Sequence, residues 1–127
     1  MIGYVTLGTN DLARAAIFYD AIAAELDTPR MMEFDGFIAW GKAEGDAAGI
    51  GLTKPFNGDS ASVGNGVMVA LAAKDKDQVK RLYDIALANG GTCEGEPGPR
   101  GEGFYAGYFR DPDGNKLNAF VMGPAAT

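Results

Sequence analysis

An asparagine occupies a chemically decisive place in the segment RDPDGNKLNAF, residues 110–120. The polar turn DPDG leads into an apolar strand, and Asn118 lies on that strand among apolar neighbours. A carboxylate in the same place would suit a hard divalent cation. A neutral amide instead donates and accepts hydrogen bonds, either to a bound molecule or to backbone and water. Both interpretations of Asn118 remain open at the level of sequence.

The chain contains no histidine, and this absence restricts its chemistry more than any other feature. Histidine is the commonest general base near neutral pH, and its imidazole is a common ligand of zinc. Ser-His-Asp and Cys-His catalysis are therefore excluded within one chain. The single Cys93 has no imidazole to activate it, so we expect a small side chain packed in or near a strand. We assign no catalytic residue.

Other side chains are candidates for contacts with a bound molecule. Trp40 offers a stacking platform, although a lone tryptophan on a strand more often belongs to the core. Tyr105 and Tyr108 lie on opposite faces of one strand, so at most one of them faces a binding site. Arg100, in the segment PGPRGEG, either clamps an anionic group or remains solvated.

The composition narrows the classes of partner. The 127 residues fit one domain, and a formal charge of −6 makes nucleic acid a poor partner, because an acidic surface repels phosphate. No basic cluster favours an anionic membrane, and no apolar run approaches the ~20 residues of a membrane span. The N-terminal segment lacks the pattern of a signal peptide, and one cysteine permits no internal disulfide. We therefore expect a cytoplasmic protein.

An internal repeat organises the chain. Residues 4–28 align with residues 68–92 without a gap, at an offset of 64. The aligned pairs include Val5 with Val69, Leu7 with Leu71, Asp11 with Asp75, and Tyr19 with Tyr83. The motif DGFIA at 35–39 aligns with EGFYA at 102–106 at an offset of 67, as a small loop insertion would produce. The sequence therefore predicts two copies of one module.

Each module is predicted to contain a strand, a helix and three further strands. The expected strands cover 2–7, 31–34, 37–41 and 48–53, then 67–73, 92–94, 104–110 and 115–122. One helix begins near Asn10, a good N-cap, and the other follows Asp75, which forms a capping-box pattern with Gln78. The modules then span 1–54 and 66–123, joined by a polar, glycine-containing linker over 55–65.

A helix covers only one face of its sheet, so the second face of each module needs a partner. If the sheets curl together, their inner faces line a cup with the helices outside, and cups bind small molecules. The predicted fold is a single α+β domain in which two βαβββ modules form a cup-shaped mixed sheet.

Paired modules with these signatures resemble the vicinal oxygen chelate superfamily, which contains glyoxalase I, bleomycin resistance proteins and extradiol dioxygenases. The resemblance is carried by VTLGTNDLARAAIFYDAI in the first module and by YFRDPDGNKLNAF in the second, and it extends from Ile2 to about Gly123. It implies the same cup-shaped fold and a homodimer. It is a poor guide to substrate, because this scaffold hosts many reactions.

The resemblance places four metal-ligand positions on Tyr4, Met68, Asn118 and Gly51. Metal enzymes of the superfamily often carry histidine or glutamine at the first position, and usually histidine at the second and glutamate at the third. A phenol, a thioether, an amide and a glycine suit no common metal ion. The chain departs from these enzymes at every position, so we expect no metal and no other cofactor.

Strand alternation, in the register of that superfamily, places mostly apolar side chains with a few polar tips on the inner face. The candidate ligand-binding residues are Tyr4, Thr6, Trp40, Gly51, Met68, Arg100, Tyr105, Asn118 and Phe120. For Tyr4, Met68 and Phe120 the alternative is simple core packing. Such a lining suits a flat or aromatic ligand.

We therefore expect a metal-free protein of the bleomycin-resistance type that binds a small apolar or aromatic molecule in the cup. One alternative is a metal-dependent lyase or dioxygenase with unusual ligands, for example Glu33 shifted inward. The other is a non-catalytic interaction module whose cup is filled by its own side chains.

Overall fold

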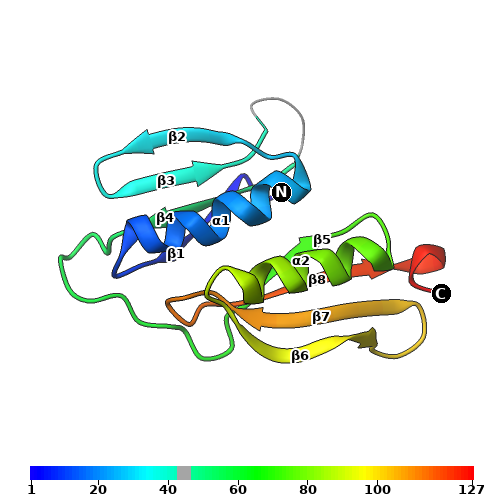
Figure 1. Ribbon diagram of the computed structural model, residues 1–127. Coiled ribbons are helices and arrows are strands. Elements are labelled where there is room, and N and C mark those ends of the chain that lie inside the picture. Colours follow the sequence, from blue (N-terminus) through cyan, green and yellow to red (C-terminus); the bar gives the residue numbers. More distant parts are fainter. Residues whose placement is uncertain (43–46) are drawn as a thin grey trace.

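The computed structural model describes residues 1–42 and 47–127, and it shows two βαβββ modules (Figure 1). The first contains β1 (Tyr4–Gly8), α1 (Leu12–Leu26), β2 (Arg30–Phe34), β3 (Phe37–Trp40) and β4 (Gly49–Thr53). The second contains β5 (Val69–Ala72), α2 (Lys76–Ala88), β6 (Thr92–Pro99), β7 (Phe104–Arg110) and β8 (Lys116–Met122), followed by the short 3-10 helix η1 (Gly123–Ala126). Neither described helix is long and apolar enough to cross a membrane.

The two sheets share one topology, as expected for a repeat. Their strand orders are β1-β4-β3-β2 and β5-β8-β7-β6. In each sheet the first strand of the module pairs parallel to the last, and the remaining pairs are antiparallel. The predicted α+β class with two βαβββ modules is confirmed, in the form of two open four-stranded sheets.

Strand β6 differs most from its expected bounds, because it continues to Pro99 instead of ending near residue 94. Its pairing with β7 shifts register twice, between Cys93 and Gly95 and again between Gly95 and Gly98. These irregularities accommodate a glycine- and proline-rich segment on the edge of the sheet, where a missing backbone donor is tolerated.

Helix α1 begins one residue later than the sequence suggested. Asp11, not Asn10, is the N-cap, and its carboxylate accepts a hydrogen bond from the backbone N–H of Arg14 at 3.1 Å. The Asn10 side chain instead bonds to both backbone groups of Ala61 in the linker, at 2.7 and 3.2 Å. The helix ends at Asp27, whose left-handed backbone (φ 55°) terminates it.

Helix α2 begins at the capping pattern that the sequence predicts. Asp75 accepts a hydrogen bond from the backbone N–H of Gln78 at 2.8 Å. The Gln78 side-chain oxygen in turn accepts a hydrogen bond from the backbone N–H of Lys74, one residue before the cap, at 2.8 Å. Its amide nitrogen also donates to Glu25 at the end of α1, which ties the two helices together.

Both helices lie on the same side of the two sheets (Figure 1). The core lies between them and the strands. Its largest fully buried side chains include Phe18, Phe109, Leu52, Leu82 and Leu117. Among the described residues, no helix covers the opposite face of each sheet, and below we call this face the open face.

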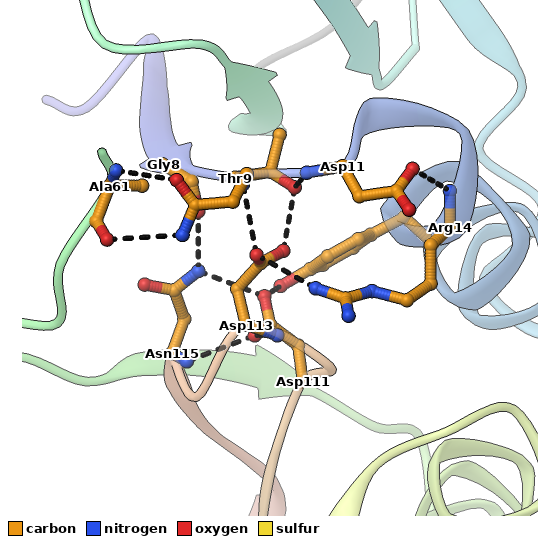
Figure 2. Close-up of polar contacts among 10 residues, drawn as sticks. Gly8, Thr9, Asp11, Arg14, Ala61, Asp111, Asp113 and Asn115 are labelled. Carbon is orange, nitrogen blue, oxygen red and sulfur yellow. Dashed lines mark hydrogen bonds and ion pairs between the residues drawn. The ribbon is translucent and has the colours of Figure 1, made fainter. Parts of the chain in front are cut away.

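A polar junction joins the second module to the start of α1 (Figure 2). The carboxylate of Asp113, in the β7–β8 turn, accepts hydrogen bonds from the Thr9 hydroxyl at 2.6 Å and from the Asn10 backbone N–H at 3.0 Å. It also pairs with the Arg14 guanidinium at 3.0 Å. The DPDG segment is thus a turn, as predicted, and also a contact between modules.

Asp111 forms the buried half of this junction. Its Oδ2 accepts a hydrogen bond from the Tyr19 hydroxyl at 2.7 Å and from the Asn115 side chain at 3.0 Å. Asn115 also donates to the backbone carbonyl of Gly8 at 2.9 Å, so it reaches the first sheet as well (Figure 2). Polar groups at the junction are therefore paired across the modules, which fixes the relative position of the two open faces.

Candidate functional site

The open face of the first sheet holds a small apolar cavity of about 150 Å³. Its wall comes from the starts of β1 and β4 and from β2 and β3, and includes Tyr4, Met31, Met32, Phe37, Ala39 and Lys42. Tyr4 stands at its rim with 68% of its surface exposed. The lining offers one phenol and one ammonium group among apolar atoms, which suits a flat, mostly apolar molecule.

Phe37 fills the space over Gly51 on this face. Thr6 and Gly51 are neighbours in the β1–β4 pairing, and Ala39 and Gly51 are neighbours in the β3–β4 pairing. A Cβ atom at Gly51 would lie 2.9 Å from two ring carbons of Phe37 and 3.3 Å from the Thr6 methyl group. The glycine therefore lets the ring approach the strand closely.

On the open face of the second sheet, Asn118 is buried with an unsatisfied amide. It lies between Ala70 on β5 and Tyr108 on β7, and only 2% of its surface is exposed. Its Oδ1 atom has no hydrogen-bond partner among the described residues. An unpaired buried carbonyl oxygen costs free energy, and such groups often belong to functional sites.

Aromatic and cationic side chains lie on the same face of the sheet as this asparagine. Arg100 and Lys116 both lie over the Tyr108 ring, at 5.5 and 5.6 Å from its centroid. Phe104 and Phe120 stack on one another with centroids 5.7 Å apart and planes 15° apart. The open face of the second sheet thus combines flat apolar surfaces with two positive charges.

These two faces belong to a fold that comparisons with known proteins identify. The sequence matches the glyoxalase/bleomycin resistance protein/dioxygenase superfamily over residues 1–119. The chain belongs to this superfamily. No match was found among curated protein sequences.

Several solved structures share the architecture. A glyoxalase/bleomycin resistance protein from Albidiferax ferrireducens T118 is 36% identical, with a TM-score of 0.86 over 94% of this chain and 97% of that one. Lactoylglutathione lyase from Agrobacterium tumefaciens is 21% identical, with a TM-score of 0.67 over 94% and 92% of the two chains. Hypothetical protein SA1046 from S. aureus is 22% identical, with a TM-score of 0.73 over 94% and 91%.

The residues at the positions that the resemblance assigned to metal ligands do not fit a metal ion. Position 51 is covered by the Phe37 ring, and position 118 carries a neutral amide. Met68 lies just before β5 and offers a thioether, which suits only soft metal ions. Within the described ranges, no three His, Cys, Asp or Glu side chains cluster as ligands would.

Glu33 does not supply the missing carboxylate. It pairs with Ile38, which is buried on the helix-covered side, so Glu33 faces away from the open face. Its carboxylate accepts a hydrogen bond from Arg30 at 2.7 Å. A shift inward would break this ion pair and reverse the alternation of β2.

Two candidate residues point to the core instead of the open face. Trp40 is 4% exposed, lies beside Tyr19 and donates its indole N–H to Asp20 at 2.8 Å. Tyr105 is also buried, and Lys76 of α2 lies over its ring. Strand alternation places both residues on the helix-covered face, so their expected place in the cup is corrected.

Groups with shifted pKa values also lie on the helix-covered side. Burial and the neighbouring Asp111 carboxylate raise the pKa of Tyr19 well above its usual value. A hydrogen bond from Arg30 lowers the pKa of Asp20 despite some opposing desolvation. Both groups take part in structural contacts, so their shifts do not mark a catalytic centre.

Several residues of the open faces were missing from the sequence-based set. Phe37, Met32 and Lys116 could have been found by strict alternation once one buried residue of each strand was known, and Tyr108, which the sequence offered beside Tyr105, is the one of the two on the open face. The contact of Arg100 with Tyr108 had no sequence signal, because it depends on the irregular path of β6.

Proposed function

We propose that the protein binds a small apolar or aromatic molecule on its open faces and does so without a metal ion. The observation that carries the proposal is the apolar cavity on the first sheet, whose wall includes the Phe37 ring over Gly51. A ring in that place provides a stacking surface where a metal ligand would otherwise project. We assign no reaction to the site.

We further propose that two copies of the chain pair through their open faces in the cytoplasm. Large apolar side chains lie uncovered there, including Tyr4, Met32, Phe34 and Met68. Burying such a surface against a second copy would remove it from water and close a cup around the ligand. Light scattering coupled to size-exclusion chromatography should give a mass of two chains, and a monomer at micromolar concentration would refute the pairing.

A thermal-shift screen with neutral and charged aromatic compounds tests the binding proposal. We expect several compounds to raise the melting temperature of the wild-type protein, and Tyr4→Ala to weaken the effect. Ile17→Ala is the matched control, because Ile17 is also exposed and apolar but lies on α1, away from the open faces. Absence of any shift across the screen would favour the interaction-module alternative.

Elemental analysis of protein purified without chelators tests the metal-free part of the proposal separately. We expect far less than one equivalent of zinc, iron, nickel or manganese per chain, because the available donors bind these ions poorly. A stoichiometric metal would instead support the alternative of a lyase or dioxygenase with unusual ligands.

A further inference from the structure

We propose that the open face of the second sheet selects an aromatic anion that also carries a hydrogen-bond donor. Arg100 and Lys116 would hold its negative group beside Tyr108, and Asn118 would accept its donor. This inference rests on the proposed function, because it names the chemical class of the bound molecule.

Arg100 carries a positive charge that no described carboxylate neutralises. The other four arginines, Arg14, Arg30, Arg81 and Arg110, each form an ion pair. Within the described part of the chain, Arg100 donates only to backbone carbonyls, those of Glu96 at 2.7 Å and Pro99 at 3.3 Å. These neutral acceptors fix the guanidinium in place and leave its charge available to a ligand.

Two glycines make room for this guanidinium. A Cβ atom at Gly95 would lie 3.2 Å from its Nη2, and one at Gly98 would lie 3.1 Å from its Nη1. Larger residues there would push the guanidinium away from the strand and from the Tyr108 ring. The local sequence of β6 therefore places a positive charge on the open face, and both glycines lie at its register shifts.

Lys116 brings a second positive charge to the same ring. It lies two residues before Asn118 on β8, so its side chain emerges on the same face. No described carboxylate lies within ion-pair distance of its ammonium group. Two like charges beside one tyrosine repel each other, and a bound anion would relieve that repulsion. The attraction is local, because the protein as a whole carries a charge of −6 and repels anions.

Asn118 supplies the acceptor for the hydrogen-bond donor of the ligand. Its buried Oδ1 atom lacks a partner, and Tyr108 is its direct neighbour across the β7–β8 pair. A hydroxyl or N–H group on the ligand would satisfy this oxygen after a rotamer change of a neighbouring side chain uncovers it. The stacked rings of Phe104 and Phe120 provide a wall for the aromatic part of the same molecule.

Three naphthalene probes separate these contributions when their binding is measured by calorimetry. The probes are 6-hydroxy-2-naphthoate (anion and donor), 2-naphthoate (anion alone) and 2-naphthol (donor alone). Charge-assisted hydrogen bonds should make 2-naphthoate bind about tenfold more tightly than 2-naphthol, and raising the salt concentration should reduce this difference. The hydroxylated acid should bind most tightly of the three.

The double variant Arg100→Gln/Lys116→Gln should lose the preference for the two acids while retaining affinity for 2-naphthol. Lys116→Gln alone should give an intermediate loss, and this keeps the test valid if Arg100→Gln disturbs β6. The control Lys74→Gln/Lys80→Gln makes the same change in net charge on exposed positions and should keep the preference. Asn118→Leu should weaken the two probes that carry a hydroxyl donor, 6-hydroxy-2-naphthoate and 2-naphthol, and leave the affinity for 2-naphthoate unchanged.

The outcomes distinguish this inference from the proposed function. Equal affinity for 2-naphthol and 2-naphthoate, unaltered by the double variant, would overturn the anion selection while binding on the open face stands. Absence of binding by all three probes would also overturn it, and the thermal-shift screen with other compounds would then decide the proposed function on its own.

Discussion

The Phe37 ring lies against Gly51 so closely that a Cβ atom at position 51 would approach two ring carbons to 2.9 Å. This contact closes the point at which metal enzymes of the superfamily are expected to place a ligand. It also forms part of the cavity wall, since Phe37 lines that cavity. In the proposed function, one aromatic ring thus provides a binding surface at a position that the resemblance assigns to a metal ligand.

Gly51→Ala should lower the free energy of unfolding by about 1–3 kcal/mol, because the added methyl group overpacks against the ring. Phe37→Ala removes that ring, so Gly51→Ala should cost little in the Phe37→Ala background. Urea denaturation of the four proteins in this double-mutant cycle measures the coupling. Additive effects would show that the cost of Gly51→Ala does not come from contact with the Phe37 ring.

Asn118→Leu should raise the free energy of unfolding by about 1 kcal/mol, because it replaces an unsatisfied amide with an apolar side chain of similar size. Asn118→Ala is the companion variant, and it should destabilise the protein by leaving a cavity. Thermal and urea unfolding measure both effects. Destabilisation by leucine comparable to that by alanine would mean that the amide is well bonded in solution.

Asp113→Ala should lower the free energy of unfolding by about 2–4 kcal/mol, because the buried Thr9 hydroxyl and the Asn10 N–H lose a charged acceptor. Arg14→Ala is the control, since the Arg14 side chain is 50% exposed whereas that of Asp113 is 3% exposed. This exposed partner should contribute less than about 1 kcal/mol. Equal losses in the two variants would place the stabilisation in the ion pair instead of the two hydrogen bonds.

The stability of the protein should fall above pH ~10, the pKa of an ordinary tyrosine. Burial and Asp111 raise the pKa of Tyr19 in the folded state, so its contribution is complete below the unfolded-state pKa. It is lost as the pH rises toward the folded-state pKa, because unfolding then releases a proton. Urea denaturation from pH 8 to 11 measures this slope.

Tyr19→Phe isolates that contribution. The variant should lose about 1 kcal/mol at neutral pH with its hydrogen bond to Asp111, and its stability should decline less steeply above pH ~10 than that of the wild type. Identical slopes for Tyr19→Phe and the wild type would contradict the prediction.

The repeat and the helix stripes made most of the fold predictable. Equivalent residues such as Leu7 and Leu71 both enter the core, because local patterns with a regular period determine which side of a strand or helix is buried. The start of α1 was placed one residue early, because Asn10 and Asp11 are both good caps. The choice between them depends on Ala61, which is distant in sequence.

The candidate site was less predictable, because it too depends on contacts between residues that are distant in sequence. The pairing of Ala39 with Gly51 places Trp40 and Gly51 on opposite faces of their sheet, but this register between two strands cannot be obtained from alternation within each strand. The placement of Arg100 over Tyr108 depends on two register shifts in β6. Side-chain contacts between strands require the tertiary structure, because no local period encodes them.

The wall at Phe37 is formed by a side chain and not by the backbone. Changing that single codon would reshape the recess without altering the path of any strand. Proteins with this fold could therefore change which molecule the cavity accepts through single substitutions, while the cores beneath the two helices stay intact.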